Sequence, residues 1–237
     1  MKKPFVSVII PTLNEEKYIE KTLKALKNQD FEGKFEIIVA DGMSKDDTVK
    51  IARKYADRVV LVKKRGIAAG RNEGARVAKG DVLIFVDADT VLLPNTISEL
   101  VKAFKNKKVV GAACPIIPLS AKIEDFFLYW GYNQYMKATL KTKRPHVPGI
   151  CCAYRKDAFW EVNGFNEKMK AWEDYDLSER ISKLGKIVLV ESTLAITSPR
   201  RIKAWGKLGA VLKYLKLHFN YLLKGKSPSA KEYEPVR

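Results

Sequence analysis

The residues in this sequence best suited to chemistry are two aspartates, Asp87 and Asp89, which follow directly after the apolar run 84–86. Alternate side chains of an extended strand point to the same side, so the two carboxylates would share one face. Ionised carboxylates at the end of a buried strand need a counter-charge, and their oxygens suit Mg²⁺ or Mn²⁺. Such a metal would hold a nucleotide diphosphate. The structural alternative is that the aspartates cap a helix that begins near Pro94.

The segments around these aspartates alternate between strand and helix patterns. Apolar, β-branched runs predict strands at 5–10, 35–40, 58–62, 82–86 and 109–113. Helical periodicity predicts helices at 14–28, 48–55, 68–78 and 96–104. This order is typical of a mostly parallel sheet with helices on both faces. Ligands of such sheets bind at the carboxyl ends of the strands, where the turns 11–14, 41–42 and 87–89 all fall.

The second half of the chain is less regular. The aromatic-rich segment 122–136 is interpreted as a helix or as a lid over the site. A strand at 150–154, a helix at 174–184 and a final strand at 187–190 are expected to follow. The sequence contains no internal repeat and no low-complexity linker.

The composition is that of a folded protein with one large domain or two small ones. Of the 237 residues, 46% are hydrophobic and 30% are charged, which excludes a disordered chain. The net charge of +17 favours polyanionic partners: phosphorylated substrates, an anionic membrane surface or nucleic acid. Because no nucleic-acid signature with the expected spacing is present, we predict no nucleic-acid partner.

Cysteine usage and the apolar runs indicate the compartment. The three cysteines form neither a disulfide framework nor a metal-type pattern, and Cys151 and Cys152 are predicted to pack in the core. The first apolar run stops at Pro11, too early for a signal peptide, and no run is long enough to span a bilayer. We therefore expect a cytoplasmic protein, with the cytoplasmic face of the membrane as the alternative. His146 is expected at the surface.

Five short elements resemble, in order, those of family 2 glycosyltransferases. They are VIIPTLNEE at 8–16, VADGMSKDDT at 39–48, GRNEG at 70–74 with AKGD at 78–81, FVDAD at 85–89, and NGFNE at 163–167 followed by WEDYDL at 172–177. The resemblance implies an α/β protein of the GT-A fold, a single Rossmann-like domain with a central, mostly parallel sheet. It also implies a nucleoside-diphosphate sugar donor of UDP or GDP type, a divalent cation, Mg²⁺ or Mn²⁺, and inversion at the anomeric carbon. The segment TSPRR at 197–201, followed by Trp205 and Gly206, resembles a compact prokaryotic or archaeal type of this family without transmembrane helices.

Carried over position by position, the resemblance assigns the donor site. The implied nucleotide-sugar-binding residues are Pro11, Thr12, Asn14, Glu15, Asp41, Arg71 and Asp87. Within this set, Asp41 would accept a hydrogen bond from the base, Arg71 would lie near the diphosphate, and Asp87 would lie near the ribose and the metal. Asp89 would bind the metal itself. The alternative for Asp41 is a simple turn, since Asp-Gly pairs are favoured there.

The later acidic element supplies the implied catalytic residue. Asp174 matches the general base that removes the proton of an acceptor hydroxyl, a role typically worth about 10² to 10⁴-fold in rate. Glu173 and Asp176 are the fallback candidates. The alternative is that all three form the acidic first turn of a helix, which the helix dipole favours.

Two arginines follow Pro199 late in the chain. Arg200 and Arg201 would either clamp phosphate from a loop, since Pro199 fixes the turn before them, or begin a solvated basic tail. We favour phosphate contact by one of them and include both in the nucleotide-sugar-binding set.

The C-terminal segment has the pattern of a basic amphipathic helix. Apolar residues recur at i, i+3 and i+4 between Trp205 and Leu222, and lysines occupy the other side. We therefore predict a GT-A catalytic domain at 1–202, a helix at 203–226 and a polar tail at 227–237. The helix would either rest on an anionic bilayer or pack on the catalytic domain.

These observations predict a metal-dependent, inverting glycosyltransferase of the hexosyltransferase type that acts on a hydroxyl acceptor. The first alternative is a polyprenyl-phosphate glycosyltransferase of the dolichyl-phosphate type, whose anionic lipid acceptor needs no base. The more distant alternative is a non-catalytic nucleotide-sugar-binding protein. The intact set of acidic elements argues against it.

Overall fold

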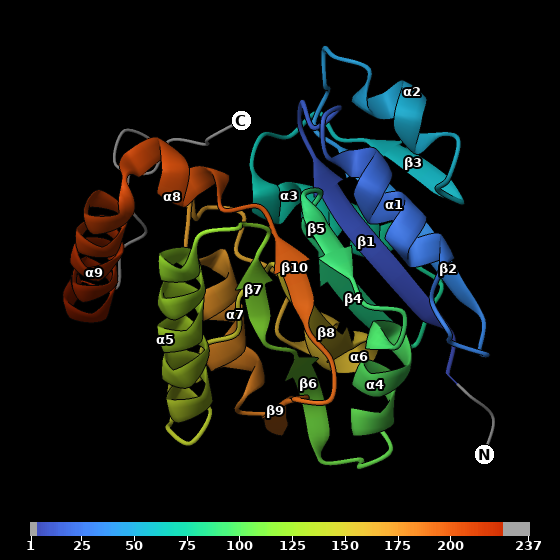
Figure 1. The fold of residues 1–237 in the computed structure, drawn as a ribbon. Coiled ribbons are helices and arrows are strands. Elements are labelled where there is room, and N and C mark those ends of the chain that lie inside the picture. Colours follow the sequence, from blue (N-terminus) through green and yellow to red (C-terminus); the bar gives the residue numbers. More distant parts are fainter. Residues whose placement is uncertain (1–3, 225–237) are drawn as a thin grey trace.

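The computed structural model describes residues 4–224 and contains a central seven-stranded sheet in the order β3-β2-β1-β4-β8-β6-β9 (Figure 1). Its strands are β1 (Val6–Thr12), β2 (Phe35–Asp41), β3 (Arg58–Leu61), β4 (Val82–Val86), β6 (Val109–Ala113), β8 (Cys151–Arg155) and β9 (Lys186–Leu189). Strand β8 runs antiparallel to β4 and β6, and the other pairs are parallel. The predicted mostly parallel sheet is confirmed.

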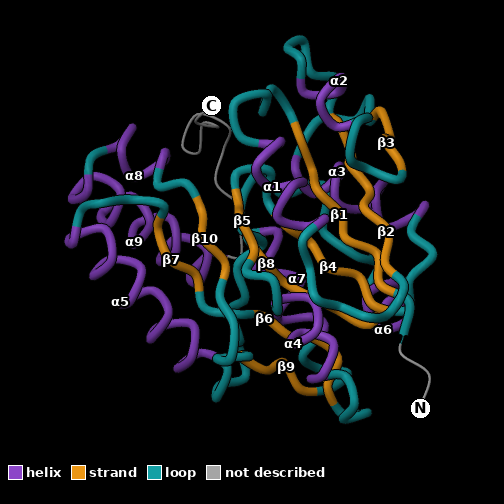
Figure 2. The backbone as a smooth tube through the Cα atoms, turned by 45° about the vertical axis from the view of Figure 1, so that its right-hand side comes forward, coloured by secondary structure: helices purple, strands orange, loops and turns teal. Residues whose placement is uncertain are grey.

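Helices cover both faces of this sheet (Figure 2). They are α1 (Ile19–Lys27), α2 (Thr48–Ala52), α3 (Ile67–Val77), α4 (Thr96–Ala103), α5 (Ile123–Thr139), α6 (Lys156–Glu161) and α7 (Glu173–Ile181). Because side chains alternate along β1, Val8 and Ile10 pack with Leu23 of α1 on one face, whereas Ile9 packs with Phe159 of α6 on the other. A buried core therefore lies on each face of the sheet, and the two cores fix the strands whose carboxyl ends carry the predicted site.

The first predicted helix begins five residues later than its predicted start, at Ile19 rather than Asn14. Asn14 has a positive φ of 55°, which an α-helix excludes, so the residues after β1 form a loop. The N–H groups of Tyr18 and Ile19 donate to the carbonyl of Glu15, which leaves Glu15 in the loop before the helix. This loop carries Glu15 to the carboxyl edge of the sheet.

A second, three-stranded sheet was not predicted. It has the order β5-β10-β7 and consists of β5 (Thr90–Leu92), β10 (Ala195–Thr197) and β7 (Ile116–Pro118). Strands of three residues are too short to give a periodic signal. Their pairing matters for the site, because the Ser198 N–H donates to the carbonyl of Asp89 at 3.2 Å. The segment after β10 is thereby held beside the end of β4.

The predicted single C-terminal helix is wrong at its start. The structure has α8 (Arg200–Trp205) and α9 (Lys207–Lys224), separated by Gly206 at φ 72° and ψ 154°. Only glycine adopts this backbone region readily, so the chain breaks there. Residues 225–226 of the predicted helix and the predicted tail 227–237 lie outside the described residues. Within residues 4–224, no helix is long and apolar enough to cross a bilayer.

Candidate active site

The turn after β4 carries the two aspartates that the sequence singled out. The N–H of Asp87 donates to the carbonyl of Ile150 at 3.0 Å, and the Thr22 hydroxyl donates to the carbonyl of Ala88 at 2.7 Å. The Asp87 side chain is 26% exposed and that of Asp89 is 8% exposed. The turn is therefore fixed by its neighbours on both sides, and the Asp87 carboxylate keeps access to solvent.

Arg200, the first residue of α8, joins this turn to the loop after β1. Its Nη1 and Nη2 donate to the two carboxylate oxygens of Glu15 at 2.7 and 2.8 Å. Its Nε lies 3.0 Å from Oδ2 of Asp89, and the guanidinium stacks over the ring of Tyr18. A bidentate, charge-assisted contact of this kind fixes both partners. Arg200, Glu15 and Asp89, all predicted site residues, therefore lie together, and Tyr18 was missed.

Arg201 points to a different environment. Its guanidinium lies over the ring of Trp205, and Nη1 donates to the Tyr214 hydroxyl at 3.4 Å. The structure thus separates the two arginines that the sequence grouped. Arg200 lies in an acidic cluster formed by Glu15, Asp87 and Asp89, whereas Arg201 lies against α9.

The acidic cluster holds more negative charge than Arg200 alone balances. Burial raises the pKa of Asp89 to about 6, and repulsion by Asp87 and Glu15 adds to the rise, while Arg200 opposes it. A further cation at Asp89 would remove this penalty on the ionised carboxylate.

Asp41 ends β2 at the same edge and is fully buried. Its Oδ2 accepts hydrogen bonds from the hydroxyls of Thr12 and Ser44 at 2.8 and 2.6 Å, and its Oδ1 accepts from the Ser44 N–H at 2.8 Å. The neighbouring Asn14 accepts from the Lys45 N–H at 2.9 Å. These bonds connect the loops after β1 and β2 into one wall. The bonds to Asp41 use three of the about four acceptor positions of its carboxylate.

Arg71, on α3, is buried beneath the site. It is 2% exposed, and its Nη2 donates to Oδ1 of Asp87 at 2.9 Å and to the carbonyl of Gly149 at 3.0 Å. Its Nη1 donates to Oε1 of Glu173 at 2.7 Å. Burial lowers the pKa of Arg71, but the carboxylates of Asp87 and Glu173 outweigh this effect and raise the pKa above its ordinary value. The sequence prediction set Arg71 near a diphosphate, whereas the structure has it bridging two acidic elements.

Gly149 is required by this bridge. A Cβ atom at this position would lie 2.2 Å from Nη2 of Arg71. Its N–H donates to Oδ2 of Asp174 at 2.9 Å, so the same glycine contacts the bridge and the predicted base. The sequence offered no signal for this role.

The three acidic residues of α7 have different partners. Glu173 is held by Arg71, and Asp176 is held by Arg180, whose Nε donates to it at 2.8 Å. Asp174 instead accepts backbone N–H bonds from Gly149 and Tyr175, each at 2.9 Å. Burial raises the pKa of Glu173 to about 7, repulsion by Asp174 adds to the rise, and Arg71 opposes it.

Trp172 sets the direction in which α7 begins. It has a positive φ of 66°, which is a strained conformation for a bulky residue. Its ring lies against His146 and against Tyr214 of α9. His146 is itself 3% exposed and stacks on Tyr175 at 4.7 Å, so the predicted surface position of His146 is wrong. The rings around it belong to Tyr132 and Tyr135 of α5 and to Trp172 and Tyr175 at the start of α7.

The cysteines are structural, as predicted from their apolar surroundings. Cys114, Cys151 and Cys152 are all free and buried. Burial raises the pKa of the Cys152 thiol well above its ordinary range, which makes it a poor nucleophile.

The carboxylate oxygens of Asp87 and Asp89 fit a divalent metal ion of the kind that binds together with a nucleotide. Among residues 4–224, no group of three or more acidic, histidine or cysteine side chains is gathered as a preformed metal cage. Mg²⁺ beside nucleotides typically keeps several waters and uses one or two carboxylates plus substrate phosphates. Asp87 uses Oδ1 for Arg71 and Asp89 uses Oδ2 for Arg200, so each has a second oxygen. These two residues would hold the metal.

Comparison with known proteins identifies the class of protein to which this site belongs. Residues 7–162 match the sequence profile of glycosyl transferase family 2, and the chain belongs to this family. A validoxylamine A glucosyltransferase of Streptomyces hygroscopicus subsp. limoneus is 27% identical over 220 residues, covering 77% of this chain and 49% of that protein. The chain spans about half or less of the curated relatives that it matches first.

Two solved structures show the same GT-A fold. The mannosyltransferase PcManGT from Pyrobaculum calidifontis, in complex with GDP-Man and Mn²⁺, is 26% identical with a TM-score of 0.73, covering 100% of this chain and 68% of that chain. S. aureus TarS 1-349 in complex with UDP-GlcNAc is 25% identical with a TM-score of 0.67, covering 83% of this chain and 59% of that chain. The predicted family and fold are confirmed.

Proposed function

We propose that this chain transfers a sugar from a nucleoside-diphosphate sugar to a hydroxyl acceptor, with inversion at the anomeric carbon. The observation that carries the proposal is the buried Arg71, which contacts Asp87 on one side and Glu173, the neighbour of Asp174, on the other. One guanidinium thus joins Asp87, on the proposed donor side, to the residue that precedes the proposed base. The neighbours bound to GDP-Man and UDP-GlcNAc support a GDP or UDP donor.

The residues proposed to bind the nucleotide-sugar donor lie at the carboxyl ends of β1 and β2, in the loop after β1 and at the start of α8. Asp41, with Pro11, Thr12 and Asn14 beside it, would contact the nucleoside. Arg200 would supply positive charge to the diphosphate from its position between Glu15 and Asp89. Arg201, held against α9, stays a weaker candidate for phosphate contact. Arg71 is proposed as a positioning residue for Asp87 instead of a direct diphosphate ligand.

Asp87 and Asp89 would hold Mg²⁺ or Mn²⁺, and the Mn²⁺ in the PcManGT complex supports this assignment. The bound metal would neutralise negative charge on the departing diphosphate. Arg200 would share this task through its guanidinium.

Asp174 would act as the general base. Its carboxylate takes the proton of the acceptor hydroxyl while that oxygen forms its bond to the anomeric carbon. The bond from the anomeric carbon to the diphosphate oxygen breaks in the same displacement, and the nucleoside diphosphate leaves. The N–H groups of Gly149 and Tyr175 orient the carboxylate for this transfer.

The exposed aromatic residues of α5 favour a second candidate acceptor, a polyprenyl phosphate. Such an acceptor is already anionic and would not need Asp174. The cytoplasmic location, the absence of a nucleic-acid partner and the domain boundary at residue 202 stay predictions.

The test is a donor-turnover assay with Mn²⁺, measuring released UDP or GDP with water and a panel of sugar hydroxyls as acceptors. We expect Asp174→Asn to bind donor normally and to lose about 10² to 10⁴-fold in turnover. Asp176→Asn is the matched control, because the Asp176 carboxylate is engaged by Arg180. Near-normal turnover by Asp174→Asn with a hydroxyl acceptor would exclude the assigned base, and turnover only with a polyprenyl phosphate would favour the second candidate.

A further inference from the structure

Helix α5 exposes an unusual amount of apolar side chain. Ile123, Phe127 and Trp130 are 67%, 67% and 63% exposed, and Phe126 is 37% exposed. Their spacing of three and four residues puts them on one side of the helix, where they line a shallow hollow of about 270 Å³. Large exposed patches of this kind mark surfaces that bind another molecule.

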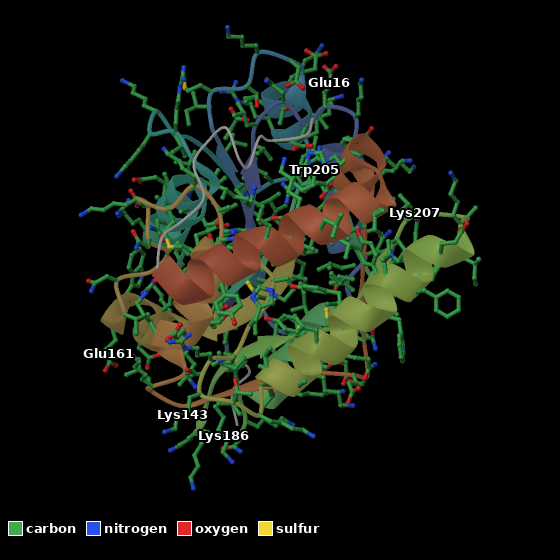
Figure 3. All side chains as sticks on the ribbon, turned by 90° about the vertical axis from the view of Figure 1, so that its left-hand side faces the viewer. Glu16, Lys143, Glu161, Lys186, Trp205 and Lys207 are labelled. Carbon is green, nitrogen blue, oxygen red and sulfur yellow. The ribbon has the colours of Figure 1, made fainter. Side chains whose placement is uncertain are left out.

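The first turns of α9 add a second exposed apolar set. Leu208 and Leu212 are 72% and 57% exposed, and Val211 is 36% exposed. Helices α5 and α9 lie side by side on one flank of the molecule (Figures 1 and 3). The Lys207 ammonium, labelled in Figure 3, lies 3.4 Å from Oε2 of Glu124. Since Glu124 follows Ile123 and Lys207 precedes Leu208, this ion pair brings the starts of the two apolar sets close together.

The charges around the two sets are basic. Lys122 precedes α5, Lys203 lies in α8 and Lys216 lies one turn beyond Leu212 in α9, and all three lysines are exposed. The acidic Glu124 is paired with Lys207, so little negative charge remains at this corner. A second copy of a chain with net charge +17 would bring like charges together. An anionic lipid surface is instead complementary to this pattern of aromatic residues and lysines.

We propose that these two sets form a lipid-docking face, composed of Ile123, Phe126, Phe127, Trp130, Leu208, Val211 and Leu212, that lies on an anionic bilayer. Arg200, which contacts Asp89, is the first residue of α8, and the α9 part of this face follows directly after α8. Docking would therefore hold the candidate active site at the lipid surface. The inference goes beyond the proposed function and does not depend on it, because binding to lipid is measured without donor or acceptor.

The test is co-sedimentation of the full chain with phosphatidylcholine vesicles that contain or lack phosphatidylglycerol. We expect binding to the anionic vesicles at low salt and little binding to phosphatidylcholine alone. The double variant Phe127→Ser/Trp130→Ser should weaken binding by about tenfold or more, because two side chains that enter the interface are lost. Leu61→Ser is the matched control, since Leu61 is 52% exposed on β3 at the far edge of the sheet.

A second pair of variants tests the charge. Lys203→Gln and Lys216→Gln should each weaken binding by about fivefold. Lys107→Gln, an exposed lysine before β6, should leave binding unchanged. Absence of sedimentation with anionic vesicles, or an equal loss in Leu61→Ser, would overturn the proposal. So would light scattering that shows a dimer abolished by Phe127→Ser/Trp130→Ser, because a second copy would then cover the face.

Discussion

Arg71 and Glu173 are 102 residues apart in the sequence, yet Nη1 of Arg71 donates to Oε1 of Glu173 at 2.7 Å in the interior. The other end of the same guanidinium reaches Asp87 at 2.9 Å. The buried arginine supplies a counter-charge to the buried Glu173 and to the partly exposed Asp87. The contact connects α3, the turn after β4 and the start of α7, which are the elements that carry the candidate donor site and base.

Removing Arg71 should destabilise the protein strongly. Arg71→Ala leaves Asp87 and Glu173 without their shared partner, and losing one partner of a buried pair costs about 3–5 kcal/mol. Urea unfolding measures this loss. Arg76→Ala is the matched control on the same helix, because Arg76 pairs with Glu73 at the surface and should cost about 1 kcal/mol or less. Equal losses for the two variants would contradict the bridging role.

Adding one methyl group at Gly149 should disturb the same bridge. The Cβ of Gly149→Ala would lie 2.2 Å from Nη2 of Arg71, so the guanidinium or the loop must move. We expect a loss of about 1–3 kcal/mol in unfolding free energy and a lower donor turnover. Gly131→Ala, in α5 with open space around its Cβ, should instead stabilise by about 0.5–1 kcal/mol. A neutral Gly149→Ala would show that the loop adapts freely.

Glu173 should make stability depend on pH. Its folded pKa of about 7 lies above the ordinary value of 4.5 because of burial and repulsion by Asp174. The folded state therefore holds the proton more tightly than the unfolded state, and this contribution is complete below the unfolded pKa and lost as pH rises through about 7. The unfolding free energy of wild type minus that of Glu173→Gln should fall between pH 5 and pH 8. If this free-energy difference instead rose between pH 5 and pH 8, the pKa of Glu173 would be lowered in the folded state, which would contradict the prediction.

Arg200 should contribute mainly to donor binding. Arg200→Ala removes the contacts to Glu15 and Asp89 and the positive charge proposed for the diphosphate. Charge-assisted hydrogen bonds contribute about 1.5–3 kcal/mol, so donor affinity measured by calorimetry with Mn²⁺ should fall roughly ten- to hundredfold. Arg200→Lys should recover only part of it, because lysine lacks the planar fork. Arg201→Ala is the comparison variant, and a larger loss there would exchange the two roles.

The sequence predicted those parts of the protein whose structure is set by residues that are close together in the chain. Buried strands such as β4 appear as apolar runs, and Asp87 and Asp89 follow from the turn that ends it. The short strands of the second sheet have no periodic signal, so the position of Arg200 beside Asp89 was not derivable. The burial of Arg71 likewise depends on Glu173, which only the folded chain brings near.

The helix break at Gly206 was likewise not predictable from the sequence pattern. The apolar spacing continues across it, because a single positive φ changes the backbone direction without changing the side-chain pattern. Long-range contacts and backbone conformation, rather than residue type, set these features.

The most direct test of the central claim is the melting temperature of wild type and Asp89→Ala with UDP and GDP sugars, each with and without Mn²⁺. At a hundredfold excess over its dissociation constant, a bound donor stabilises the folded protein by about 2.7 kcal/mol. We predict an Mn²⁺-dependent rise in the melting temperature of wild type with at least one donor, and no such rise in a folded Asp89→Ala. No rise with any donor, or the same Mn²⁺-dependent rise in Asp89→Ala, would contradict the assignment of this turn as the metal and donor site.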